Sequence, residues 1–371
     1  MKNLLRTILY YLSGFSKRNN DYVVLGAWFG KRFSDNSRYV IEELKQNRDY
    51  RIIWIGEKSL KSDVENASVE FVRRNSLKSA YYLLRAGNAL VSHGYQDLGT
   101  FNLMRNADVI QLWHGFPLKR IGSDNKRSRN EGIHSYENYS YFLANSKLMK
   151  ERMISAFHNY GANEGNVIIA EQPRVKYLKS MSDNEDKIRS IKEFLKLPLD
   201  ATIISYLPTF RDTSEKIFSF SETSNEKLDD YLIKNNIYIL ERQHFVREAN
   251  NSINRNNIIV ISERLDVQDL LLVTDLLITD YSSVYVDFLP LHKPIVHFLY
   301  DGKEYEENDR GLYCDSLIEE AGGSIIYSKD ELDNFIMNKS SWSTSIVEDD
   351  KILKLIGNNE KSNIIDYLRG I

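Results

Sequence analysis

The sequence contains a single cysteine, Cys314, among 371 residues, so no disulfide can form within the chain. Such cysteine usage is typical of the reducing cytoplasm. Basic residues are not in excess, because 49 Lys and Arg face 52 Asp and Glu for a net charge of −3, which argues against general binding to nucleic acid. No apolar run approaches the roughly 20 residues that span a bilayer. No GxGxxG follows the first expected strand and GxxxxGK[ST] is absent, which disfavours dinucleotide oxidoreductases and P-loop NTPases.

The composition is that of a globular protein, with 42% hydrophobic and 27% charged residues, and the length suffices for two α/β domains. Short β-rich runs alternate with helical segments, which is typical of parallel α/β layers. The expected strands are residues 22–28, 51–55, 88–92, 108–113, 141–144, 201–206, 237–241, 257–261, 276–279 and 294–298. The expected helices are 37–46, 76–85, 266–273, 282–289 and 349–369, and a charged stretch at 179–187 is expected to connect the two domains.

The segment QLWHGFPLKRIG, residues 111–122, places a histidine at the end of an expected strand. Gly115 and Pro117 break the chain directly after His114, and Lys119 and Arg120 follow. An imidazole can take a proton from an alcohol near neutral pH, and neighbouring cations can hold phosphate. A lone histidine is more often structural, but this setting favours His114 as a general base.

The segment ITDYSSVYVDFLPLHKPIVHF, residues 278–298, brings two hydroxyls to the expected start of a helix. Ser282 and Ser283 follow Asp280, which ends a buried strand. Backbone N–H groups at a helix start, together with two hydroxyls, can cradle a phosphate. The alternative is that Ser282 only caps the helix. Two isolated carboxylates, Asp280 and Asp287, are weak metal ligands, so no metal site is predicted.

Three further loops carry a cation or a histidine near the end of an expected strand. Arg211 in YLPTFRD can grip a phosphate bidentately, with a structural ion pair as the equal alternative. His244 follows the expected strand 237–241, and Arg310 lies in DRGLYCD, residues 309–315. The other histidines are expected to be structural, namely His93, His134, His158, His292 and His297.

The first 18 residues, MKNLLRTILYYLSGFSKR, place Leu5, Ile8, Leu12 and Phe15 at helical spacing among basic residues. A signal peptide would need a longer apolar stretch and a small-residue cleavage site. Two interpretations are equal on the residues alone. The helix rests on anionic lipid at a membrane interface, or it packs on the protein's own surface.

Taken in order, these segments resemble the CDP-glycerol glycerophosphotransferase family of teichoic acid biosynthesis, which includes primases, polymerases and ribitol-phosphate relatives. The resemblance runs from about residue 22 to residue 315 and is carried by WHGFPLKRIG, YLPTFRD, LLVTDLLITDYSSVYVDF, KPIVHF and RGLY. It implies an α/β, GT-B-like fold of two Rossmann-like domains facing across a cleft. The expected division is a membrane-interface helix at 1–18, an N-terminal acceptor domain at 19–185 and a C-terminal CDP-polyol donor domain at 186–371.

The resemblance also implies site residues. Two histidines matter in the family, at positions matching His114 and His244. Donor phosphates lie against a segment whose matching residues here are Thr279, Asp280, Ser282 and Ser283, with basic help from Arg211 and Arg310, and Lys119 adds a cation beside His114. The sequence departs from the family at Phe116, at EQPRVKY in place of GxPRxD, and at Phe245.

The function implied is transfer of glycerol phosphate from CDP-glycerol to a hydroxyl of a lipid-linked teichoic acid or capsule precursor, with release of CMP. The acceptor would be an undecaprenyl-diphosphate-linked saccharide or a polyol-phosphate chain. A membrane-bound product favours a peripheral enzyme on the cytoplasmic side of the cell membrane, with residues 1–18 at the lipid surface. No cofactor is implied, and a divalent metal requirement stays open. The alternatives are a CDP-ribitol-dependent transferase, a GT-B sugar-nucleotide glycosyltransferase, and a non-catalytic envelope protein.

Overall fold

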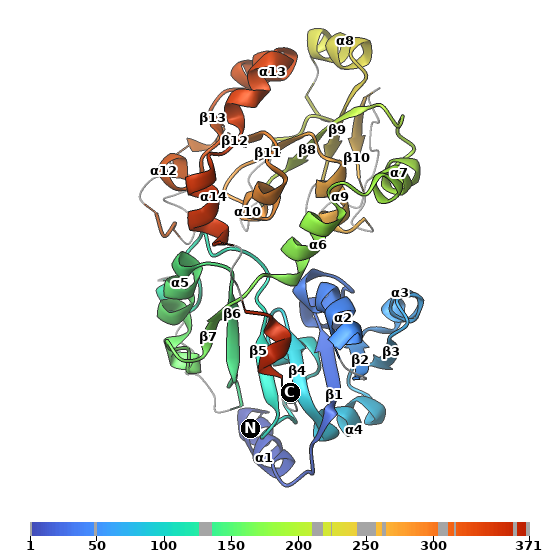
Figure 1. Cartoon of the computed structure of the whole chain (residues 1–371), viewed down its shortest axis with the longest axis vertical. Helices are drawn as coiled ribbons and strands as arrows, with labels where there is room; N and C mark the ends of the chain where they lie inside the picture. The colour runs from blue at the N-terminus through green and yellow to red at the C-terminus, as the bar shows by residue number, and fades with distance from the viewer. Residues whose placement is uncertain are drawn as a thin grey trace. The chain divides into compact units, whose positions relative to one another are not determined.

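The computed structural model describes residues 2–47, 50–125, 136–209, 218–223, 225–242, 257–261, 265–302, 311–314, 317–358 and 362–368. The chain divides into two compact units. The first unit comprises Met1–Lys176 and Lys354–Ile371, and the second comprises Tyr177–Leu353. In each unit helices pack around a central parallel sheet (Figure 1).

The first unit is built on a seven-stranded sheet in the order β3-β2-β1-β4-β5-β6-β7, with all neighbouring strands parallel. Its strands are β1 Asn19–Gly26, β2 Arg51–Gly56, β3 Glu70–Arg73, β4 Ala86–Val91, β5 Asp108–Gln111, β6 Tyr141–Ala144 and β7 Val167–Ile169. The order reverses between β1 and β4. In sheets of this kind ligands bind at the carboxyl ends of the strands near such a switch point.

The second unit has a six-stranded parallel sheet in the order β10-β9-β8-β11-β12-β13. Its strands are β8 Thr202–Leu207, β9 Ile237–Glu241, β10 Ile258–Val260, β11 Leu276–Thr279, β12 Ile295–Phe298 and β13 Ser324–Ile326. Numbered from its own first strand, this is the Rossmann order 3-2-1-4-5-6, and its switch point lies between β8 and β11.

The helices of the first unit are α1 Lys2–Ser13, α2 Asp35–Asn47, α3 Lys61–Asn66, α4 Leu77–Arg85, α5 Lys147–Phe157 and α6 Pro173–Met181, which runs into the second unit. Those of the second unit are α7 Glu185–Phe194, α8 Glu226–Lys234, α9 Val267–Val273, α10 Val284–Phe288, α12 Leu317–Ala321, α13 Lys329–Met337 and α14 Asp349–Ile356, whose last residues belong to the first unit. Helix starts use side-chain caps. Ser146 accepts the backbone N–H of Met149 at α5, and Asp266 that of Gln268 at α9, which satisfies N–H groups that a helix leaves unpaired.

Both faces of the first sheet are buried, as a parallel sheet requires. Along β1, Val23 and Leu25 belong to one core and Val24 to the other, because successive strand residues point to opposite faces. Residues 362–368 return to this unit. Ser362 forms a parallel bridge with Ala170, which follows β7, and Ile364, Ile365 and Leu368 are buried in the core of this unit.

The structure confirms the predicted α/β class with two Rossmann-like domains. It also contains β3, β7 and β13, which were not predicted and which have only three or four residues each. The predicted helix 349–369 is wrong as a continuous element. α14 ends at Ile356 because Gly357 has φ 74, a left-handed conformation that terminates helices.

The predicted connection at 179–187 is also corrected, because α6 ends at Met181 and α7 begins at Glu185. The units separate between Lys176 and Tyr177, not after residue 185, and residues 354–371 group with the first unit. The charged, apolar-poor composition of residues 179–187 was interpreted as an inter-domain connection. The two units instead divide within α6.

Candidate active site

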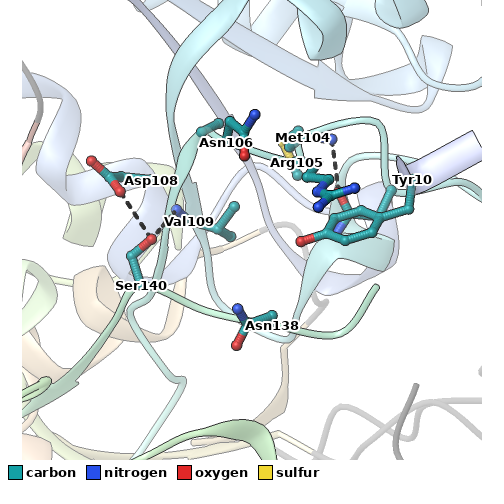
Figure 2. A pocket seen from close by; sticks show the side chains of 10 residues that line it. Tyr10, Met104, Arg105, Asn106, Asp108, Val109, Asn138 and Ser140 are labelled. Carbon is teal, nitrogen blue, oxygen red and sulfur yellow. Dashed lines mark hydrogen bonds between the residues drawn. The ribbon is translucent and has the colours of Figure 1, made fainter. Parts of the chain in front are cut away.

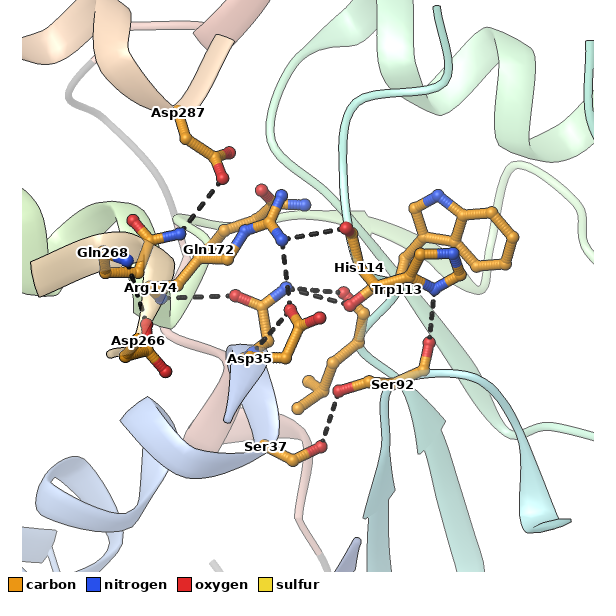
Figure 3. Close-up of polar contacts among 12 residues, drawn as sticks. Asp35, Ser37, Ser92, Trp113, His114, Gln172, Arg174, Asp266, Gln268 and Asp287 are labelled. Atoms are coloured by element: carbon orange, nitrogen blue, oxygen red, sulfur yellow. Dashed lines mark hydrogen bonds and ion pairs between the residues drawn. The ribbon is translucent and has the colours of Figure 1, made fainter. Parts of the chain in front are cut away.

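His114, the predicted general base, follows β5 in the first unit. Its Nδ1 lies 3.0 Å from the carbonyl oxygen of Ser92, which follows the neighbouring strand β4. A carbonyl oxygen only accepts hydrogen bonds, so Nδ1 carries the proton and Nε2 is the basic nitrogen. Ser92 is held in turn by a 2.8 Å hydrogen bond between its Oγ and that of Ser37 in α2 (Figure 3). These contacts give the imidazole one tautomer and one orientation.

A second imidazole, that of His93, stacks on His114. Their ring centroids are 3.9 Å apart and their planes differ by 3°. The Trp28 ring packs on His93 at 4.5 Å between centroids. Burial, and to a smaller extent the electrostatic influence of His114, Arg174 and Arg32, lowers the pKa of His93 to about 2. His93 is therefore neutral at physiological pH.

The buried carboxylate of Asp97 organises the loops around the two histidines. It accepts the backbone N–H groups of Ser92, His93 and Phe29 at 3.0, 2.8 and 2.7 Å. Burial raises the pKa of Asp97 to about 6, although the backbone hydrogen bonds act in the opposite direction. Because Phe29 follows β1 and Ser92 follows β4, Asp97 joins the two strands at the switch point. Phe29 has φ 56, and such strained backbone tends to cluster at functional sites.

The backbone that carries His114 is held by two buried side chains, Asn36 and Arg174. Asn36 Nδ2 donates to the carbonyl oxygens of Leu112 and Trp113 at 3.2 and 3.0 Å. Arg174 Nη1 donates to the His114 carbonyl oxygen at 2.8 Å and forms an ion pair of 3.1 Å with Asp35. Figure 3 shows Asp35, Arg174 and His114 together in this arrangement.

Beyond the histidine, the WHGFPLKRIG segment packs on α5. Phe116 is buried, and the Arg152 guanidinium lies 5.1 Å from its ring centroid. A Cβ on Gly122 would lie 2.3 Å from a backbone oxygen of α5, and its φ is 50, so glycine is required there. The predicted phosphate-binding cation Lys119 is partly exposed in this segment.

In the second unit, fully buried Asp280 joins the ends of β8 and β11. Its Oδ1 accepts the backbone N–H of Thr209 at 2.7 Å and the Thr209 hydroxyl at 2.5 Å. Thr279 donates from its hydroxyl to the Leu207 carbonyl oxygen at 2.7 Å. Because β8 and β11 flank the switch point, these contacts fix the two loops that the sequence marks for phosphate binding.

Ser282 and Ser283 are partly exposed after this junction. The helix they precede, α10, covers Val284–Phe288 and is shorter than the predicted 282–289. Ser282 Oγ accepts the backbone N–H of Val284 at 3.4 Å. Ser283 makes no side-chain capping bond. Ser282 therefore has part of a capping role, and the Ser283 hydroxyl is not used as a cap.

Three other predicted site residues, His244, Arg211 and Arg310, lie outside the described residues. Within the described ranges, His, Cys, Asp and Glu side chains form no group of three or more that could hold a metal ion. Among the helices that the structure describes, none combines the length and the apolar character needed to cross a bilayer.

A separate polar pocket of about 300 Å³ lies beside the amino end of β5, and Figure 2 shows the side chains that line it. Tyr10 of α1, Arg105, Asp108 and Ser140 are among the residues that line it. Asp108 begins β5, whereas His114 follows the end of that strand, so this pocket is distinct from the active site.

Sequence reasoning missed His93, Asn36 and Arg174. For His93 a signal was present, because His93-Gly94 follows β4 as His114-Gly115 follows β5. The two strands are neighbours, with Val91 opposite Gln111. A repeated His-Gly pair at two adjacent strand ends predicts two imidazoles close together.

Comparison with known proteins identifies the family of this chain. Residues 8–353 match the family model of CDP-glycerol:poly(glycerophosphate) glycerophosphotransferase. The chain is 30% identical over 327 residues to a teichoic acid poly(glycerol phosphate) polymerase of Bacillus spizizenii, which covers 83% of this chain and 81% of the relative. It is 25% identical over 368 residues to a teichoic acid glycerol-phosphate primase of Bacillus subtilis, covering 91% and 90%.

The fold agrees as well. The solved structure of the wall teichoic acid polymerase TagF matches with a TM-score of 0.78 and 25% identity, over 96% of this chain and 90% of that one. The GT-B-like class and the family resemblance expected from the sequence are thereby confirmed. With two Rossmann-like units, a stacked histidine pair at the ends of two neighbouring strands and a family match along most of its length, the chain belongs to the CDP-glycerol:poly(glycerophosphate) glycerophosphotransferase family.

Proposed function

We propose that the enzyme transfers glycerol phosphate from CDP-glycerol to a hydroxyl of a lipid-linked teichoic acid or capsule precursor. The acceptor oxygen attacks the β-phosphorus of CDP-glycerol, the bond from that phosphorus to the bridging oxygen breaks, and CMP leaves. The proton of the acceptor hydroxyl passes to Nε2 of His114. One phosphodiester bond forms as one pyrophosphate bond breaks, so the chemistry balances without an oxidant or a reductant.

The observation that carries this proposal is the 3.0 Å hydrogen bond from His114 Nδ1 to the Ser92 carbonyl oxygen. It leaves Nε2 as the basic nitrogen, which is the state a general base needs before the reaction. The stacked imidazole of His93 is neutral, because burial lowers its pKa to about 2. A neutral neighbour does not repel the proton that His114 takes up.

The second unit supplies the donor site in this proposal. The hydroxyls of Ser282 and Ser283 are partly exposed and contact the diphosphate. The buried residues Thr279 and Asp280 hold the strand ends behind them. The charge on the departing CMP is offset by Lys119, Arg211 and Arg310, and His244 binds phosphate or protonates the leaving group. Phosphoryl transfer depends mainly on positioning and electrostatics, so this set is sufficient in kind.

The lipid-linked acceptor places the enzyme peripherally at the cytoplasmic membrane surface. Helix α1 supports this location, because one side of it is held by the first unit and the other is exposed. The Arg105 backbone N–H donates to Ser13 Oγ at 3.2 Å, and the Arg105 guanidinium lies 4.2 Å from the centroid of the Tyr11 ring. Arg18, which follows the helix, donates from its guanidinium to the carbonyl oxygens of Leu83, Leu103 and Arg105 at 2.5, 3.1 and 2.6 Å. The exposed side carries an apolar stripe, whose exposed fractions run from 47% to 89%, formed by Leu4, Leu5, Ile8, Leu12 and Phe15. Such a stripe beside basic residues suits an anionic lipid surface.

The experiment that tests the proposal offers the enzyme CDP-glycerol, CDP-ribitol or UDP-sugars with a synthetic prenyl-diphosphate saccharide. CMP release is measured, and the product is identified by mass spectrometry. We expect CMP and a product extended by glycerol phosphate with CDP-glycerol alone. Extension by ribitol phosphate would assign the ribitol donor instead. Release of UDP with a new glycosidic bond would reject phosphotransfer.

A further inference from the structure

The main-chain segment that carries His114 has an unusual conformation. β5 ends at Gln111, and the last ladder bond runs from the Leu112 N–H to the Val91 carbonyl oxygen at 2.8 Å. Trp113 then has φ 58, a left-handed conformation that non-glycine residues avoid because Cβ crowds the following carbonyl oxygen. A residue in this conformation persists only where its surroundings hold it.

Side chains, not the sheet, hold this segment. Three consecutive carbonyl oxygens, those of Leu112, Trp113 and His114, each accept a hydrogen bond from Asn36 or Arg174, at distances from 2.8 to 3.2 Å. Asn36 and Arg174 also contact each other, because Asn36 Oδ1 accepts the Arg174 backbone N–H at 3.2 Å. The two residues therefore act as one clamp on three carbonyls.

The clamp is itself buried and fixed. Asn36 is 0% exposed and Arg174 is 5% exposed. The Arg174 guanidinium is oriented by its ion pair with Asp35, whose Oδ1 also accepts the Asn36 backbone N–H at 2.9 Å. A buried ion pair of this kind is weak evidence for stability, since desolvation offsets much of the attraction. Its placement against the His114 carbonyl indicates a geometric role.

We propose that Asn36 and Arg174 are positioning residues that hold the strained Trp113–His114 backbone and thereby aim the His114 imidazole for proton abstraction. The inference rests on the proposed function, in which His114 is the base. Without the clamp, Trp113 relaxes out of the left-handed conformation, and the imidazole leaves the Ser92 carbonyl and the His93 ring. Neither residue needs to touch the substrate.

The first test is kinetic. Asn36→Ala is expected to lower kcat for CMP release about 100-fold, the loss typical of a misplaced catalytic group, while the Kd of CDP-glycerol measured by calorimetry is unchanged. Arg174→Met is expected to behave in the same way, and Arg174→Lys, which keeps a cation and a donor, restores part of the lost kcat. A change in Kd without a change in kcat would instead assign the clamp to donor binding and overturn the inference.

The second test removes the group through which the clamp acts. In a His114→Ala background, adding Asn36→Ala is expected to change the residual rate by less than about twofold, because residues acting through one group are non-additive. A further tenfold loss would show that Asn36 acts by another route. If the wild-type enzyme releases no CMP from CDP-glycerol, the proposed function itself fails, so the two failures are distinguishable.

A matched control separates positioning from folding. Asn88 is also 0% exposed, and its Nδ2 donates to the Asn20 carbonyl oxygen at 2.9 Å, far from His114 along β4. Asn88→Ala is expected to lower the melting temperature but to leave kcat per folded molecule unchanged.

Two-bond ¹H–¹⁵N spectra of the histidines report the tautomer of each imidazole directly. The Nδ1–H tautomer of His114 is expected in the wild type and in Asn88→Ala, and its loss is expected in Asn36→Ala and Arg174→Met. Retention of that tautomer in both clamp variants would contradict the inference.

Discussion

The imidazole rings of His93 and His114 lie face to face, with centroids 3.9 Å apart. They come from the ends of two neighbouring parallel strands, β4 and β5. The His114 imidazole is oriented by the Ser92 carbonyl, and His93 is kept neutral by burial. The His114 ring is thus oriented for proton transfer, and the uncharged His93 ring packs against its face.

Replacing His114 should sharply lower turnover and leave the binding of CDP-glycerol unchanged. His114→Gln is expected to lower kcat for CMP release by about 10²–10⁴-fold, the range for loss of a general base. The Kd of CDP-glycerol should stay within error, because none of the donor contacts proposed above involves His114. The control is His158→Gln, since His158 is exposed and its Nδ1 contacts the carbonyl oxygen of Ser155, three residues earlier in the chain. Near-normal turnover of His114→Gln would remove the base assignment.

The neutral state of His93 predicts a pH dependence of stability. Its folded pKa of about 2 lies below the unfolded value of 6.5, so the unfolded chain binds a proton that the folded protein does not. The contribution is fully present above pH 6.5 and is lost as the pH falls below it, by up to about 1.4 kcal/mol per pH unit. His93→Gln removes this dependence.

The measurement is urea unfolding of wild type and His93→Gln between pH 7.5 and 4.5. Asp97 acts with the opposite sign. Its folded pKa of about 6 is raised from 3.8, so its contribution is present below pH 3.8 and is lost as the pH rises through 6. This effect is common to both proteins and cancels in their difference. A wild-type minus variant difference that stays flat below pH 6.5 would show that His93 titrates normally in the folded state.

Asp280 should support donor binding through Thr209. Asp280→Ala leaves the Thr209 N–H and hydroxyl without their acceptor and removes two of the contacts between the segments that follow β8 and β11. We expect at least about tenfold weaker CDP-glycerol binding by calorimetry, since a lost charge-assisted hydrogen bond costs about 1.5–3 kcal/mol.

The control for this prediction is Asp275→Ala. Asp275 accepts the Ile203 backbone N–H at 2.8 Å and joins the same two strands at their opposite ends. That variant should lose stability and keep its affinity for CDP-glycerol. Equal loss of affinity in both variants would point to general damage to the sheet.

The apolar stripe of α1 should control membrane binding. Replacing Leu5, Ile8 and Leu12 together with serine is expected to weaken partition onto vesicles of phosphatidylglycerol at least about tenfold, because each buried apolar side chain contributes about 1.5–3 kcal/mol. Activity on a soluble acceptor analogue should be spared. Substitutions are preferable to deletion of residues 1–18, since the Arg18 guanidinium donates to five carbonyl oxygens of the first unit.

The matched control is Leu77→Ser. Leu77 is 93% exposed and lies at the start of α4, outside the stripe. Its replacement should leave vesicle binding unchanged. Unaltered flotation of the triple variant would exclude α1 as the membrane contact.

Much of the fold could be predicted because buried parallel strands are continuous apolar runs. β9 at Ile237–Glu241 and β11 at Leu276–Thr279 were located to the residue. β3 and β13 could not be found in the same way. They have four and three residues, and each includes polar ones such as Glu70 and Ser324, so no periodic signal accumulates.

The candidate active site also could be predicted only in part. His114 was predicted because a strand end, a Gly-Pro break and two cations stand beside it in the sequence. The partners that orient it were not predicted, because they are remote in sequence. Asn36 binds a carbonyl 76 positions away, and Arg174 binds one 60 positions away. Side chains that act on distant main-chain oxygens leave no local pattern.

The return of residues 362–368 to the first unit has a consequence for synthesis. Ile364, Ile365 and Leu368 pack against Ile168 and Ala170, yet the whole second unit is translated between them. At about 5–20 residues per second, roughly 10–40 s pass before the missing side chains emerge from the ribosome. During that interval the apolar surface of the nascent first unit that these side chains cover stays exposed to solvent.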